Sequence, residues 1–257
     1  MKKLGLVLSG GGVRGVAHIG VLKALDEAGI QVDLVSGTSA GAIIGAFYCA
    51  GLSPDEIYRI ADESGWFKIV KPTIPVKGFM KLQYLKDLLK KHINVDDFSS
   101  LKIPLHVTAI NINTTQLEVF SEGELFEKVI ASASVPLMFE PVSINGKLYL
   151  DGGLRMNLPA EPVRDQCEHL LGVNLIPEMS LNNNELSGMV KIAMRCFDIA
   201  IIENMDRQLQ ILDWVIQPDG FNEIPKFDFS FSKTKQGYEL GYRATKAMIP
   251  AIRNVLN

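Results

Sequence analysis

The chain has 257 residues, a length that suits one large α/β domain over residues 1–257. It is 47% hydrophobic and 21% charged, as is ordinary for a globular protein, and its net charge of -3 lacks the strongly basic balance of a nucleic-acid-binding protein. The three cysteines (Cys49, Cys167 and Cys196) are widely spaced, which argues against a disulfide framework or a zinc site and fits a reducing compartment. Cys49 and Cys196 stand in apolar helical stretches, where we expect them to be buried.

The first residues imitate a secretory signal, because two lysines precede an apolar run. That run is too short, and it ends in Ser9 and three glycines rather than in a cleavage site. The sequence contains no run of about 18 or more apolar residues, which is the length that a membrane-spanning helix needs. We therefore predict a cytoplasmic protein that touches a membrane peripherally at most.

Apolar runs of strand length alternate with helical periods, which predicts an α/β fold with a mostly parallel sheet covered by helices. A tight hairpin is expected at Asn145-Gly146. The expected strands are 4–8, 32–35, 105–112, 142–144, 147–150, 170–175 and 214–217. The expected helices are 16–25 with its end near Gly29, 40–50, one capped by Ser53, 189–209 and 235–255.

The segment Gly37-Thr38-Ser39-Ala40-Gly41 lies between an expected strand and an expected helix. This context is typical of a nucleophile elbow, a sharp turn that lifts a serine clear of the sheet. The flanking glycines, Gly37 and Gly41, would leave room for that turn, and the helix N-terminus would favour an anion near Ser39. A small-residue turn packed for close helix approach is the alternative.

The segment Gly10-Gly11-Gly12-Val13-Arg14-Gly15 also joins a strand to a helix. A dinucleotide fingerprint would need an acid near the end of the second strand, and Asp33 lies near its beginning. The other interpretation is an oxyanion hole beside Ser39, formed by backbone N–H groups. Arg14 either offers positive charge to a phosphate headgroup or forms a cap and salt bridge on the surface.

The residue that acts as general base is an open question. An α/β-hydrolase triad has its histidine late in the chain, after the serine and the acid, and none of the four histidines (His18, His92, His106 and His169) stands in such a context. The best candidate is Asp151, at the end of a hairpin strand and followed by two glycines. A carboxylate in water is a weak base, so the site has to be dry.

Together these segments resemble the patatin-like phospholipase family, its bacterial members included. The family is marked by a glycine-rich loop, a G-x-S-x-G elbow and a D-G-[GA] turn, here at Gly10–Gly15, Gly37–Gly41 and Asp151–Gly153. Residues 131–136 also look like the family's A-S-x-x-x-P stretch, and the likeness covers roughly residues 4–165.

The resemblance implies a three-layer patatin-like fold with helices on both faces of the sheet. It also implies a calcium-independent hydrolase of lipid acyl esters, with no cofactor, Ser39 as nucleophile, Asp151 as base and Gly11 and Gly12 foremost in the oxyanion hole. A broad carboxylesterase or thioesterase, and a regulatory partner-binding protein of the same fold, remain alternatives.

Residues 66–92 are rich in lysine and carry aromatic side chains such as Trp66 and Phe79. They are our candidate for substrate entry or peripheral membrane contact. A solvated helix with its apolar side on the core is the alternative. The residues do not indicate the lipid headgroup, the acyl length or the oligomeric state.

Overall fold

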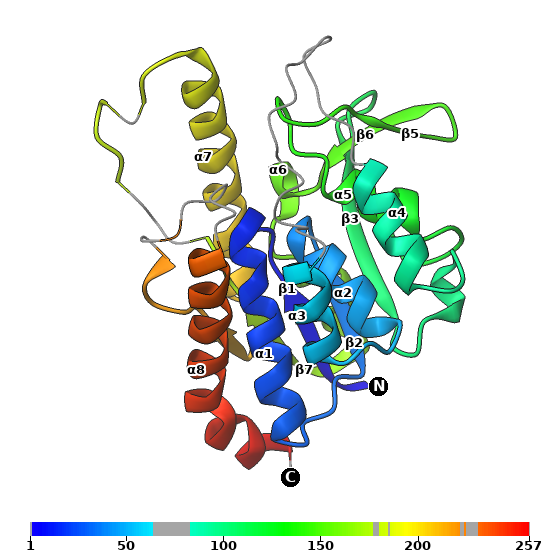
Figure 1. The fold of residues 1–257 in the computed structure, drawn as a ribbon, viewed down its shortest axis with the longest axis vertical. Coiled ribbons are helices and arrows are strands. Elements are labelled where there is room, and N and C mark those ends of the chain that lie inside the picture. Colours follow the sequence, from blue (N-terminus) through cyan, green and yellow to red (C-terminus); the bar gives the residue numbers. More distant parts are fainter. Residues whose placement is uncertain are drawn as a thin grey trace.

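The computed structural model describes residues 2–63, 83–176, 180–184, 186–221, 224 and 231–256 (Figure 1). The strands in these ranges are β1 (Lys2–Leu8), β2 (Leu34–Gly37), β3 (Leu105–Asn111), β4 (Gln116–Phe120), β5 (Val142–Ile144), β6 (Lys147–Asp151), β7 (Cys167–Val173) and β8 (Trp214–Ile216). The α-helices are α1 (Val16–Glu27), α2 (Ala40–Cys49), α3 (Pro54–Glu63), α4 (Gln83–His92), α5 (Phe126–Ser132), α6 (Gly153–Met156), α7 (Met189–Leu209) and α8 (Phe231–Leu256). Short 3₁₀ turns are η1 (Gly12–Gly15), η3 (Phe98–Ser100) and η4 (Glu161–Gln166).

All of these strands join one sheet in the order β5-β6-β3-β2-β1-β7-β8, with β4 also paired to β3. The strands from β3 to β8 in that order pair in parallel, whereas β4 and β6 run antiparallel to β3. The predicted α/β fold with a mostly parallel sheet is confirmed.

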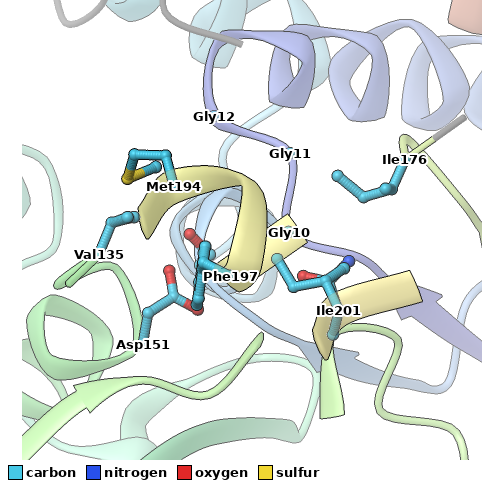
Figure 2. Close-up of a pocket in the computed structure, with 11 residues that line it drawn as sticks. Gly10, Gly11, Gly12, Val135, Asp151, Ile176, Met194, Phe197 and Ile201 are labelled. Atoms are coloured by element: carbon cyan, nitrogen blue, oxygen red, sulfur yellow. The ribbon is translucent and has the colours of Figure 1, made fainter. Parts of the chain in front are cut away.

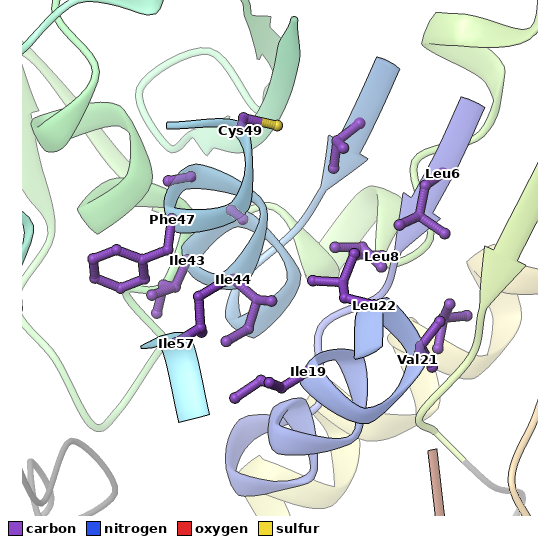
Figure 3. Close-up of a cluster of buried hydrophobic side chains, with 14 of the residues drawn as sticks. Leu6, Leu8, Ile19, Val21, Leu22, Ile43, Ile44, Phe47, Cys49 and Ile57 are labelled. Carbon is purple, nitrogen blue, oxygen red and sulfur yellow. The ribbon is translucent and has the colours of Figure 1, made fainter. Parts of the chain in front are cut away.

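Helices and turns cover both faces of the sheet. Leu4, Leu6 and Leu8 of β1 enter a large core that they share with α1, α2, α3 and α8, part of which is shown in Figure 3. Val7 points the opposite way, into a smaller core with η4 and α7. This alternation is the period of two expected for a strand that is buried on both sides. Helix α8, near the C-terminus, packs along α1 (Figure 1).

Most of the predicted elements are present, and the local signals behind them are seen. Ser53 forms the expected cap of α3, because its N–H donates to Glu56 Oε2 at 2.8 Å and its Oγ accepts from the Glu56 N–H at 3.3 Å. Asn145 and Gly146 both have positive φ, 50° and 76°, as a type I′ hairpin requires.

Other details differ from the prediction. Strand β2 begins at Leu34 rather than at residue 32, because Asp33 is used to accept the N–H groups of Lys3 and Leu4. Strand β4 and the helices α5 and α6 were not predicted; β4 and α5 carry polar residues on their exposed sides. Cys196 is exposed, whereas we expected it to be buried; Cys49 and Cys167 are buried.

Two expectations concern membranes. Most of the lysine-rich stretch, residues 66–82, lies outside the described residues. Its last part forms α4, which buries Leu85, Leu88 and Leu89, as the alternative of a helix packed on the core predicts. Within the described ranges, no helix combines the length and the apolar character needed to cross a bilayer.

Candidate active site

The position of the site follows from how three strands meet. Val107 of β3 pairs with Gly37 of β2 on one side and with β4 on the other. Ala109 of β3 pairs with Asp151 of β6 and also with β4. Strands β2 and β6 therefore pair with the same edge of β3 and run toward each other. Their last residues, Gly37 and Asp151, pair with β3 residues that are two positions apart, a spacing of about 7 Å along the strand. The elbow after β2 and the turn after β6 leave the sheet at the same point.

The elbow has the strain expected of a nucleophile turn. Ser39 has φ 54° and ψ -121°, and α2 begins at the next residue. A non-glycine residue in this conformation costs of order 1–3 kcal/mol. The turn is also tight: a Cβ on Gly37 would lie 2.7 Å from the Gly41 backbone, and a Cβ on Gly41 would collide with the carbonyl oxygen of Leu8. Both glycines are required by close backbone approach.

Asp151 lies at the end of β6 with its side chain shielded from water. The residue is 2% exposed, and its Oδ1 accepts the Gly153 N–H at 2.8 Å. Its own N–H donates to the Ser134 carbonyl at 3.0 Å. The expected dry environment for this carboxylate is present, and the backbone on both sides of it is fixed.

The glycine loop lies beside the elbow because β1 ends at Leu8, which pairs with Gly37. A Cβ on Gly10 would be 3.1 Å from Ser39 Cβ. The Gly10 N–H is already used, since it donates to the Asn157 carbonyl at 3.1 Å. The hydrogen bonds found among the described residues do not engage the N–H groups of Gly11 and Gly12. Gly12 also has a positive φ of 61°.

The remaining predicted loop residues point elsewhere. Val13 belongs to the large core, and a Cβ on Gly15 would meet the Ala40 side chain at 2.5 Å. Arg14 is buried rather than on the surface, and its Nε donates to the Ile224 carbonyl at 2.7 Å. Burial lowers the pKa of Arg14 to about 10, although Asp198 opposes that shift. Arg14 thus ties the loop to a distant segment.

The predicted groups meet at one small cavity of about 30 Å³, lined by Gly10–Gly12, Ser39 and Asp151. Its other lining residues are Val135, Asn157, Ile176, Met194, Phe197 and Ile201. Figure 2 shows Asp151 below the glycine loop, with Met194 and Phe197 of α7 beside it. The cavity combines a nucleophile, a carboxylate and a mainly apolar wall.

The histidines are placed away from this cavity, and none of the four lines it. His18 is buried, where its Nε2 donates to the Ser9 carbonyl at 2.8 Å and burial lowers its pKa to about 4. His169 lies 3.8 Å from Asp213, and His92 contacts the Phe47 ring edge-on. A base other than histidine is consistent with this arrangement.

Several supporting residues were missed by the sequence reasoning. The Ser39 N–H donates to Ser132 Oγ at 2.9 Å, so a serine of the 131–136 stretch holds the elbow. Thr38 Oγ1 lies 2.5 Å from Thr108 Oγ1 and donates to the Met156 carbonyl at 2.9 Å. The G-x-S-x-G pattern leaves the residue before the serine open, so its spacing carried no signal for Thr38.

The apolar wall from α7 was missed as well. Met194, Phe197 and Ile201 recur at spacings of three and four, so they lie on one helix face. The sequence placed a helix at 189–209 but gave no reason to direct that face at Ser39. Asp151, which lines the same cavity, is more than 40 residues away from them in the chain. The periodicity of a helix does not reveal a contact over such a distance in sequence.

A strained serine turn beside a buried carboxylate, at the strand ends of an α/β sheet, is the arrangement typical of the serine hydrolases. Within that class the chain belongs to the patatin-like phospholipase family, which matches residues 6–164. This confirms the family that the motifs indicate. The bacterial origin stays a prediction.

Individual relatives agree with this assignment. The chain is 35% identical over 205 residues to a patatin-like phospholipase domain-containing protein of Caenorhabditis elegans, an alignment of 72% of this chain and 15% of the relative. It is 27% identical over 286 residues to the lysophospholipase nte1 of Aspergillus fumigatus, covering 98% of this chain and 18% of the relative. The chain thus spans less than a fifth of the length of these curated relatives.

Solved structures show the same fold at low identity. The crystal structure of VipD from Legionella pneumophila superposes with a TM-score of 0.62 at 15% identity, over 98% of this chain and 67% of that one. The type III effector protein ExoU gives a TM-score of 0.53 at 14% identity, over 98% and 53%. At these identities the likeness is one of fold alone.

Proposed function

We propose that this protein is a calcium-independent serine acyl-hydrolase that cleaves carboxylic esters of phospholipids or lysophospholipids through a Ser39–Asp151 dyad. The observation that carries the proposal is the shared cavity of a strained serine, a buried aspartate and a glycine loop. The family membership and the lysophospholipase names of its relatives favour a lipid ester. A single domain over residues 1–257 and a cytoplasmic location belong to the same proposal.

The chemistry proceeds in two halves. Ser39 Oγ attacks the ester carbonyl carbon while Asp151 accepts its proton, and the C–O bond to the alcohol then breaks as Asp151 returns the proton to the leaving oxygen. Water, deprotonated by Asp151, attacks the acyl-enzyme and releases the fatty acid, and the proton returns to Ser39. The chain supplies both nucleophile and base, so no step needs a metal ion.

The N–H groups of Gly11 and Gly12 stabilise the oxyanion formed in each half. Loss of one such donor typically costs about 100- to 1,000-fold in rate. The residues around them contribute differently: Gly10 and Gly15 fix the loop, Val13 anchors it in the core, and Arg14 joins it to residue 224. Gly37 and Gly41 keep the elbow closed.

The apolar wall supports an acyl chain as the group bound next to the ester. Val135, Ile176 and Phe197 offer carbon surface without a charged partner for a headgroup. The cavity volume of about 30 Å³ is far below the range of about 300–1,000 Å³ for pockets that enclose a ligand. A lipid with long acyl chains therefore extends beyond it, which leaves the headgroup outside.

The test compares Ser39→Ala and Asp151→Asn with the matched variant Ser36→Ala. Ser36 is buried three residues before Ser39, and its Oγ has no hydrogen-bond partner among the described residues, so its removal leaves the elbow intact. We expect fluorophosphonate labelling in the wild type and in Ser36→Ala, and none in Ser39→Ala. Hydrolysis of lysophospholipids and of a panel of esters should fall by at least about 1,000-fold in Ser39→Ala and Asp151→Asn.

Three results would contradict the proposal. Full activity in Asp151→Asn would remove the dyad, and loss of activity in EGTA would remove calcium independence. Labelling of Ser39 with no turnover of any ester would favour a regulatory protein that retains the fold.

A further inference from the structure

Helix α7 is apolar on two opposite faces. Its inner face lines the cavity with Met194, Phe197 and Ile201. A surface helix usually presents polar residues on the side opposite its core stripe. The outer face of α7 instead presents Met189, Ile192, Cys196 and Ile199, all exposed.

The exposure of this outer face is high and confined to one end of the helix. Met189 is 86% exposed, Ile192 52% and Ile199 55%. Beyond them the exposed residues are polar, beginning with Glu203. The apolar part, residues 189–199, is roughly 16 Å long at 1.5 Å per residue. Figure 1 shows that this end of α7 stands at the same end of the molecule as α6, which follows Asp151.

The charges at the start of this part of the helix are positive. The first turn of α7 contains no acidic residue, although the helix dipole favours acids there. Lys191 and Arg195 are the charged residues of the first two turns, and the first acid, Asp198, acts on the buried Arg14. Apolar side chains with lysine and arginine at their side are typical of a helix that lies on an anionic lipid surface.

The rim of the cavity next to α7 is also apolar. Val135 lines the cavity, and Leu137, two residues later, is exposed with a φ of 69°. A leucine rarely adopts this left-handed conformation, which here holds an apolar side chain in the solvent. Figure 2 shows Val135 next to Met194 of α7, so the two rims adjoin.

We propose that residues 189–199 of α7, together with Leu137, form a docking surface for a lipid bilayer that contains anionic lipids. The choice of a lipid as the occupant rests on the proposed function. A lipid too long for the cavity keeps part of its acyl chain in the bilayer. Helix α7 both contacts the bilayer and lines the cavity. The ester can therefore reach Ser39 while the rest of the acyl chain stays out of water.

The first experiment measures sedimentation with phosphatidylcholine vesicles, with and without phosphatidylglycerol. The protein carries Ser39→Ala, so that hydrolysis does not alter the vesicles. The test variant adds Met189→Ser, Ile192→Ser and Ile199→Ser. The matched control adds Val255→Ser, which removes a 50% exposed side chain near the end of α8, at the other end of the molecule (Figure 1).

We expect the triple change to weaken vesicle binding by about tenfold or more, because each side chain loses the gain of entering the acyl region. Val255→Ser should bind as Ser39→Ala alone does. Binding should be tighter with phosphatidylglycerol and weaker in high salt. With Ser39 intact, the triple variant should keep its melting temperature and its hydrolysis of a dispersed short-chain ester, while its rate on vesicles falls with the binding.

The second experiment uses Cys196 as a reporter, since it lies between Ile192 and Ile199 and the other two cysteines are buried. A polarity-sensitive thiol dye on Cys196 should shift to the blue when vesicles are added. The same dye on a Cys196→Ser, Val255→Cys variant should not shift. This measurement reports contact with lipid independently of affinity.

Certain outcomes would overturn the proposal. These are equal vesicle binding by the triple variant and the Val255→Ser control, no vesicle binding by either, or a wild-type dimer that the triple change alone converts to monomers. The last would assign the surface to a second copy of the chain. If no ester is cleaved but the triple change removes vesicle binding, the proposed function fails and the docking surface stands.

Discussion

Thr38 is the residue through which the elbow and the Asp151 turn are joined. The chain of bonds runs from the Thr108 hydroxyl to Thr38 Oγ1, and from the Thr38 hydroxyl to the Met156 carbonyl. Thr38 and Thr108 are fully buried. Thr108 sits in β3 between the residues that pair with Gly37 and Asp151, so this network occupies the gap between the two strand ends.

We predict that Thr38→Val lowers both stability and turnover. Valine keeps the side-chain volume but leaves the Thr108 hydroxyl and the Met156 carbonyl without their partner. Each unsatisfied buried group costs about 1–3 kcal/mol, so the loss of two partners should lower the free energy of unfolding by about 2–6 kcal/mol. A displacement of the reacting groups by a fraction of an ångström should lower kcat by about 10- to 100-fold, with KM little changed.

The matched control is Thr245→Val in α8. Thr245 is also fully buried, and its Oγ1 donates to the Gly241 carbonyl at 2.8 Å, one turn earlier in the same helix. Urea unfolding and ester hydrolysis are measured for both variants. Thr245→Val should lose stability without losing kcat. If Thr38→Val turns over as fast as Thr245→Val at equal folded fraction, the network does not position the site.

Two further variants test the loop and the elbow. Gly41→Ala should abolish soluble, active protein, because the added Cβ collides with the Leu8 carbonyl oxygen; wild-type yield and activity would refute this packing argument. His18→Gln should flatten the loss of stability in acid. Burial lowers the pKa of His18 to about 4, whereas the pKa is about 6.5 in the unfolded chain. The unfolded chain therefore binds a proton first as the pH falls from about 6.5 toward 4, and the folded state loses stability over this range. The loss is about 2 kcal/mol at about pH 5. Urea unfolding at about pH 7 and pH 5 should show that difference in the wild type and not in His18→Gln.

The sequence predicted the parts of this protein that depend on local order. A strand, a glycine-flanked serine and a helix in succession define an elbow, and Asn145-Gly146 defines a hairpin turn, because each needs only a few neighbouring residues. The motif order was enough for the family. It was also enough to expect the glycine loop beside Ser39, since parallel strands end on the same side of a sheet.

The contacts that cross the chain could not be predicted in this way. Nothing in the sequence placed Ser132 under the Ser39 N–H, and no periodicity aligned α7 with the cavity. Arg14 shows the same limit, because its partner is more than 200 residues away. Cys196 was misjudged because an apolar neighbourhood predicts burial only where that helix face is covered.

The geometry of β3 explains how an aspartate comes to line the same cavity as Ser39. Strand β6 arrives antiparallel to β2 on the same edge, so its last residue comes opposite the elbow by backbone pairing. A shift of β6 by one residue would turn the Asp151 side chain to the other face of the sheet. The proposed base is thus held by the register of β6, a strand whose tight turn at Asn145-Gly146 lies several residues away from Asp151. A short carboxylate suits this position, since the strand end already lies close to the serine and needs little reach.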